Sequence, residues 1–116
     1  MIKIDNKPFW ICPNGSQIKN EEFDIAVTDL IKRGSRVYVG TDSMLRGDNC
    51  IFATVIAFHN NEKKIATYYY KKFNLVNSEY KNLKIKITEE VNLSVQAAQK
   101  VLEYSPGIDV EVHVDI

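Results

Sequence analysis

The stretch "VYVGTDSM", residues 37–44, places a carboxylate at the end of an alternating apolar run. The alternation predicts a strand with a buried face, so Asp42 stands where that strand leaves the core. Taking an unpaired charge out of water costs several kcal/mol, so a carboxylate in this position needs a partner. A cap for the turn "SMLRGD" is one explanation of Asp42, and a bound metal ion is the other.

The composition is that of one ordinary globular domain, which we expect to span residues 1–116. Hydrophobic residues make up 45% of the chain and charged residues 26%, which argues against disorder. The 15 basic and 15 acidic residues balance, so no polyanion-binding surface covers the whole molecule. Any contact with nucleic acid must therefore be local.

Nothing in the sequence has the pattern of a targeting or membrane-spanning segment. The first residues lack the apolar run of a signal peptide, and no segment approaches the ~18 apolar residues of a membrane span. Cys12 and Cys50 lack a CxxC spacing, so we expect both to be reduced. Together these features predict a cytoplasmic protein.

Three strands follow one another in the middle of the chain. Residues 36–42, 50–59 and 65–73 have strand-like patterns and are separated by short polar turns. Such an order predicts an antiparallel meander. The middle strand, "CIFATVIAFH", is apolar on both faces, which predicts that other elements cover it on both sides.

Two helices flank this meander. Residues 20–33 repeat apolar side chains at helical spacing, with Asn20 as the expected N-cap and Gly34 as the stop. A second helix is predicted from about residue 78 to 104, where "SPG" ends it. Its expected buried stripe consists of Ile87, Val91, Val95, Ala98, Val101 and Leu102.

Acidic residues on the second helix and on a final strand can then be placed. At about 100° per residue, Glu90 lies on the flank of the apolar stripe and can face the sheet, whereas Glu89 points nearly the opposite way. Residues 108–116 alternate strictly, with His113 and Asp115 on the polar face. Because this strand follows a helix, we expect it to lie parallel to the first strand of the meander.

Three antiparallel strands, a crossover helix and a fourth strand parallel to the first form the core of the ribonuclease H-like fold, a mixed α/β architecture. Here an extra helix precedes it. Three motifs carry a closer likeness, namely "VGTDS" closing the first strand, a glutamate followed four residues later by a serine, and "H-x-D" in the last strand. The residues concerned are Gly40, Thr41, Asp42, Ser43, Glu90, Ser94, His113 and Asp115. From about residue 20 onward, the chain resembles the YkuK-type family of ribonuclease H-like proteins.

This resemblance implies that Asp42, Glu90 and Asp115 meet as catalytic residues and as metal ligands. Carboxylates this close repel one another unless cations neutralise them, and hard oxygen ligands favour Mg²⁺ or Mn²⁺. In the related nucleases such ions activate water and stabilise the leaving oxygen. The expected activity is metal-dependent hydrolysis of phosphodiesters in RNA or in an RNA/DNA hybrid, with Ser43 and Arg46 binding the substrate.

Each of these residues also has an ordinary interpretation, and a second function stays open. A lone helical glutamate is usually solvated, a loop arginine such as Arg46 usually faces water, and a hydroxyl such as that of Ser43 usually bonds the backbone. The run "YYYKKF" mixes aromatic and basic residues as strands that grip nucleic acid do, although strand alternation explains it equally well. The alternative function is a catalytically inactive module that binds nucleic acid or a protein partner.

The resemblance has one departure. Ribonuclease H-like domains normally continue past the fourth strand with a helix, a fifth strand and a further helix that carries a fourth ligand, whereas this sequence stops one residue after Asp115. We therefore expect the C-terminal part of the usual fold, and with it part of a second metal site, to be absent. The fourth strand would then have an open edge, which favours pairing with another chain and predicts a homo-oligomer.

Overall fold

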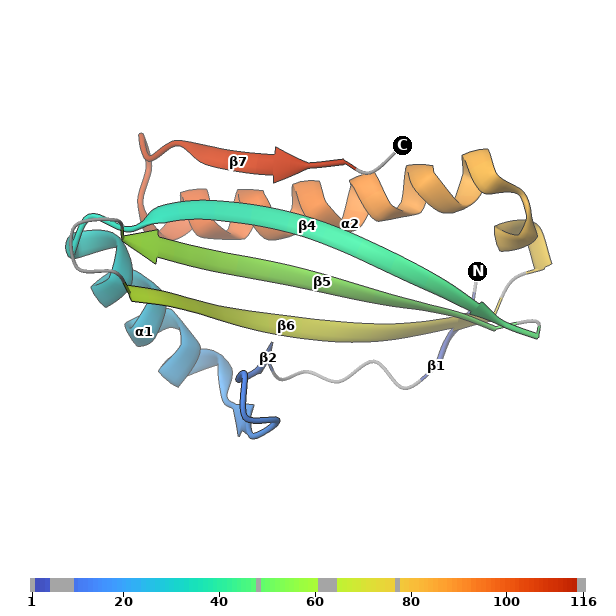
Figure 1. Ribbon diagram of the computed structural model, residues 1–116, viewed down its shortest axis with the longest axis horizontal. Helices are drawn as coiled ribbons and strands as arrows, with labels where there is room; N and C mark the ends of the chain where they lie inside the picture. Colours follow the sequence, from blue (N-terminus) through green and yellow to red (C-terminus); the bar gives the residue numbers. More distant parts are fainter. Residues whose placement is uncertain (1, 5–9, 48, 61–64, 77, 115–116) are drawn as a thin grey trace.

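The computed structural model describes residues 2–4, 10–47, 49–60, 65–76 and 78–114 (Figure 1). Within these ranges, no helix is both long and apolar enough to cross a membrane. In chain order the elements are β1 (Ile2–Ile4), β2 (Trp10–Ile11), β3 (Gln17–Ile18), α1 (Asn20–Lys32), β4 (Arg36–Arg46), β5 (Asn49–Asn60), β6 (Ile65–Val76), the 3-10 helix η1 (Ser78–Lys81), α2 (Leu83–Tyr104) and β7 (Val110–His113).

The strands form one mixed sheet in the order β3-β2-β6-β5-β4-β7, and β1 also pairs with β6. β4, β5 and β6 pair antiparallel, as the predicted meander requires, but β4 continues to Arg46. Asp42, predicted at the end of this strand, therefore lies within it and pairs with Ala53. β7 runs parallel to β4, with Val37 opposite Val110 and Gly40 opposite His113. The predicted core of three antiparallel strands, the crossover helix α2 and a fourth strand parallel to the first is therefore confirmed (Figure 1).

Both helices cover the same face of the sheet. Phe23 of α1 and Val101 of α2 belong to one buried cluster with Val39 of β4 and Phe58 of β5. Because side chains alternate along a strand, the odd-numbered residues of β5 lie on the other face, where they are only half-buried. The prediction that other elements cover both faces of this strand is therefore wrong for the described part of the chain.

Small β5 side chains explain how the uncovered side, called the open face below, stays apolar. Ala57 of β5 lies between Tyr38 of β4 and Tyr68 of β6, and Val55 lies opposite Tyr70. Large rings on the two neighbouring strands thus shield the smaller residues of the central strand from water. Apolar residues on both faces of a strand do not require a covering helix on each face when such neighbours are present.

α2 buries only part of the stripe that its apolar spacing predicts. Ala98 and Val101 are buried as expected, whereas Val95 and Leu102, also expected in the core, are 40% and 38% exposed. Small side chains dominate the true contact face and allow α2 to approach the sheet closely. The buried residues of α2 are Glu90, Leu93, Ser94, Ala97, Ala98 and Val101.

α1 ends as predicted but begins differently. Gly34 follows the helix with a φ of +86°, a left-handed conformation that glycine adopts without steric cost. The expected N-cap, Asn20, is instead the first helical residue, and Lys19 occupies the cap position without a side-chain hydrogen bond. The carboxylates of Glu21 and Glu22 favour this first turn through the helix dipole, so a capping side chain is not essential.

Candidate catalytic site at the end of β7

Buried hydroxyl groups join the central strands to α2. The Thr41 hydroxyl of β4 lies 2.7 Å from the Ser94 hydroxyl and 2.9 Å from the Thr54 hydroxyl of β5. All three residues are buried, so each hydroxyl would be costly without the partner that it finds here. These contacts fix which turn of α2 faces which residue of β4.

Glu90 lies one helical turn before Ser94 and faces the same strand. It is only 9% exposed, and the Ser43 hydroxyl donates a hydrogen bond to its Oε2. Ser43 follows Thr41 by two residues, so both hydroxyls leave β4 on the covered face. The prediction that Glu90 can face the sheet is confirmed, while the neighbouring Glu89 is half-buried rather than in solvent.

Ser43 also interacts with Cys50, which is buried and free. Burial raises the pKa of the Cys50 thiol, the nearby Ser43 hydroxyl and the charge of Lys86 partly oppose this rise, and the charge of Glu90 adds to it. The thiol therefore stays protonated at neutral pH. The Ser43 hydroxyl has one proton to donate, and it donates this proton to Glu90.

Asp42 precedes Ser43, so its carboxylate leaves β4 on the open face. The side chain is exposed and lines a hollow together with His113 and Val114 at the end of β7. Asp42 and Glu90 therefore start from opposite faces of the sheet.

The end of β7 is where the surroundings of these two carboxylates meet. β7 ends at His113, opposite Gly40, so β4 beyond this point has no further β7 partner within the described residues. The hollow beside Asp42 and a narrow crevice beside Glu90 share three lining residues, Thr41, His113 and Val114. The crevice beside Glu90 has no space for a water molecule, so of the two carboxylates it is that of Asp42 that faces open solvent here.

Asp115, one of the remaining predicted site residues, lies outside the described residues. Arg46 is exposed at the end of β4, four residues beyond Asp42 or about 13 Å along an extended strand. Among the residues that the structure describes, no three His, Cys, Asp or Glu side chains form a group that could hold a metal ion. The structure thus brings Ser43 and Glu90 together and sets Arg46 apart from them.

Sequence reasoning missed the hydroxyl network. Thr41 and Thr54 lie directly opposite each other on adjacent strands, and Ser94 approaches them from α2. The sequence does show one threonine in each of two core strands, Thr41 and Thr54. These residues indicate a hydroxyl network only when the pairing register of the two strands is known.

Comparison with known proteins identifies a family. The sequence model of a family described as Ribonuclease H-like matches residues 21–116, which include nearly everything from α1 to β7. Comparisons with curated proteins and with solved structures find no match. The matched region contains the whole β4–α2–β7 arrangement around the candidate site.

Proposed function

The chain belongs to the ribonuclease H-like family, and from this premise we propose that it is the core of a metal-dependent nuclease that hydrolyses phosphodiesters in RNA or in an RNA/DNA hybrid. The observation that carries the proposal is the environment of Glu90. This carboxylate is almost buried, and no described lysine or arginine forms an ion pair with it. The Ser43 hydroxyl satisfies one of the acceptor positions of this carboxylate, and the remaining oxygen lone pairs could bind a cation at this edge.

We assign the cation site to Asp42, Glu90 and Asp115, whose hard oxygen atoms suit Mg²⁺ or Mn²⁺. When bound, such an ion supplies an activated water and stabilises the leaving oxygen of a phosphodiester. The two described carboxylates do not complete the donor set by themselves, so the assignment depends on Asp115.

Other residues of the chain would position these carboxylates. Ser43 orients Glu90 through its hydrogen bond, and the Thr41–Ser94 contact fixes the rotation of α2 that points Glu90 at the sheet. Arg46 is too far along β4 to act at the same atom, so its role would be a contact with a neighbouring phosphate of the substrate.

Cleavage of a mixed panel of single-stranded, duplex and hybrid substrates tests the proposal. We expect cleavage with Mg²⁺ or Mn²⁺ but not in EDTA, and a loss of about a hundredfold or more in Asp42→Asn and in Glu90→Gln. Two acids that do not line the site, the exposed Asp109 and the half-buried Glu89, provide matched controls: Asp109→Asn and Glu89→Gln should retain full activity. Absence of cleavage with either metal, or equal losses in the controls, would reject the nuclease.

A second function is favoured by the open face. Tyr38 and His113 meet edge to face at 5.5 Å, Tyr68 is 41% exposed, and the Lys72 ammonium lies 5.9 Å from the Tyr70 ring centre. Aromatic rings and basic groups on a sheet can stack bases and contact phosphates of single strands. We propose as the alternative a catalytically inactive module that binds nucleic acid here.

Fluorescence anisotropy with labelled single strands separates the two functions. The inactive module should bind in EDTA and ignore Asp42→Asn, whereas Tyr68→Ala should cost about 1–3 kcal/mol of binding free energy, the usual worth of one stacked base. Metal-dependent binding that Asp42→Asn abolishes would instead support the nuclease. If none of the labelled single strands binds, the ligand of the inactive module would instead be a protein partner.

A further inference from the structure

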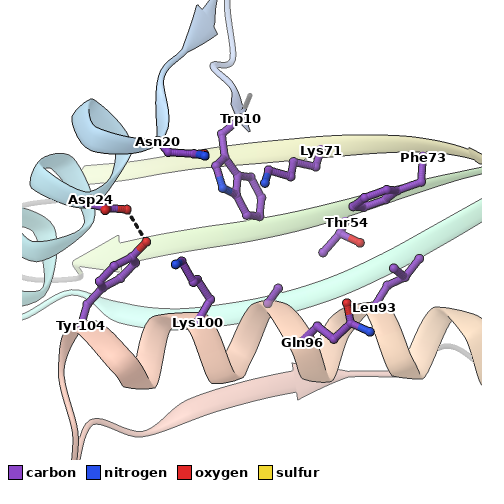
Figure 2. A pocket seen from close by; sticks show the side chains of 11 residues that line it. Trp10, Asn20, Asp24, Thr54, Lys71, Phe73, Leu93, Gln96, Lys100 and Tyr104 are labelled. Atoms are coloured by element: carbon purple, nitrogen blue, oxygen red, sulfur yellow. Dashed lines mark hydrogen bonds between the residues drawn. The ribbon is translucent and has the colours of Figure 1, made fainter. Parts of the chain in front are cut away.

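A separate cavity lies on the covered face of the sheet, with walls from α1 and α2 (Figure 2). Its volume is about 290 Å³, at the lower end of the ~300–1,000 Å³ range of small-molecule sites. Thr54 of β5 and Lys71 of β6 belong to its floor, and Trp10 of β2 stands beside them. Asp42, Ser43 and Glu90 do not line it, so this cavity is distinct from the candidate catalytic site.

Lys71 is the side chain that distinguishes this cavity. It lies on the covered face, where its neighbours in β6 are aromatic, and it is half-buried. Its ammonium lies 4.9 Å from the centre of the Trp10 ring, and within the described residues it has no ion-pair partner. Burial, and then the positive charge of Lys100, lower the pKa of Lys71. An anion in the cavity would supply the counter-charge that the protein does not.

Lys100 enters the cavity from the opposite wall, on α2 (Figure 2). Its ammonium lies 5.4 Å from the Tyr104 ring centre, and its ion pair with Glu103 is long, at 3.7 Å, and largely solvent-exposed. Exposed pairs of this kind are weak, so Lys100 can turn to a stronger partner. Gln96, one helical turn earlier, adds an amide group that can donate to the same ligand.

One carboxylate also lines the cavity. Asp24 of α1 accepts a hydrogen bond from the Tyr104 hydroxyl, and burial together with this contact raises the pKa of Tyr104 (Figure 2). Asp24 therefore forms its hydrogen bond with the neutral Tyr104 side chain and forms no ion pair with Lys71 or Lys100. With two lysines and one aspartate, the lining has an excess of positive charge beside the indole of Trp10, which is itself largely buried, at 5% exposed.

We propose that this cavity binds a small organic anion with a planar ring, of the size of a mononucleotide, whose phosphate or carboxylate lies between Lys71 and Lys100 and whose ring packs near Trp10. The two ammonium groups give charge-assisted hydrogen bonds to the anion, and the aromatic wall gives contact area to the ring. Neither group of contacts alone would select this ligand. The inference does not depend on the nuclease proposal, because the two sites share none of their proposed functional residues.

Trp10 provides the assay, because it is the only tryptophan in the sequence. The full chain is titrated with adenosine 5′-monophosphate, benzoate, adenosine and inorganic phosphate while Trp10 fluorescence is recorded. We expect a saturable change with the monophosphate or with benzoate, and the stronger of the two identifies phosphate or carboxylate as the preferred anion. Adenosine and inorganic phosphate, which each lack one half of the ligand, should bind at least about tenfold more weakly.

Lysine variants decide whether the signal comes from this cavity. Lys71→Gln and Lys100→Gln should each weaken binding by about tenfold or more, the effect of losing a hydrogen bond to a charged group. Lys84→Gln is the matched control, because Lys84 is exposed on α2 like Lys100 but does not line the cavity, and this variant should bind normally. Lys100 is exposed on α2, so its variant tests the site even if Lys71→Gln fails to fold. No saturation at millimolar ligand, tight binding of adenosine alone, or equal weakening in Lys84→Gln would overturn the proposal.

Discussion

The hydrogen bond from Ser43 to Glu90 gives the sharpest test of how the candidate site is held. Ser43→Ala removes the hydroxyl and leaves the carboxylate, which is 9% exposed, without this donor. A hydrogen bond to a charged group contributes about 1.5–3 kcal/mol, and a buried carboxylate cannot regain it fully from water. We therefore expect Ser43→Ala to lower the free energy of unfolding by about 1.5–3 kcal/mol at neutral pH.

Urea unfolding of a double-mutant cycle isolates this interaction. Wild type, Ser43→Ala, Glu90→Gln and the double variant together give the coupling energy, which we expect to lie at about 1–3 kcal/mol. The same cycle with Glu89→Gln is the matched control, because Glu89 neighbours Glu90 but lies outside the contact, and its coupling should be near zero. A Ser43–Glu90 coupling under about 0.5 kcal/mol would refute the argument that the serine holds the carboxylate.

Three further predictions concern packing, pH and assembly. Val101 is 0% exposed and Leu102 is 38% exposed, so Val101→Ala should cost about 2–3 kcal/mol in urea unfolding and Leu102→Ala clearly less, the reverse of what side-chain size suggests. Burial and Asp24 raise the pKa of Tyr104 above its ordinary 10.0, so the neutral phenol stabilises the fold below pH 10.0 and this contribution is lost as pH rises further. The free energy of unfolding, measured from neutral to alkaline pH, should therefore fall more steeply in wild type than in Tyr104→Phe. β7 is at one end of the described sheet, so we expect a homo-oligomer formed through its edge, and light scattering after size exclusion that shows a clean monomer at high concentration would contradict this.

Local patterns were sufficient for most of the fold. The meander, the two helices and the final strand all follow from spacing within short windows, and the parallel placement of β7 follows from the helix that precedes it. The prediction that Asn20 caps α1 was wrong, because acidic residues in the first turn also favour that helix end.

The candidate site was only partly predictable. The rotation of α2 pointed to Glu90 rather than Glu89, and the structure buries Glu90 against Ser43. The same reasoning misjudged part of the apolar stripe, since Ala98 and Val101 are buried but Val95 and Leu102 are exposed. A helix turns toward the surface that it packs on, and here the threonines of β4 and β5 and the small residues of α2 decided that rotation.

The sequence by itself determined the type and order of the elements from α1 to β7, and it determined that Asp42 and Ser43 leave their strand in opposite directions, because neighbouring side chains in a strand alternate. Only the tertiary structure decided that both helices lie on the Ser43 side. That choice depends on contacts between residues far apart in the chain, so no local pattern contains it. It places Glu90 and Asp42 on opposite faces, and it creates the lysine-lined cavity between α1 and α2.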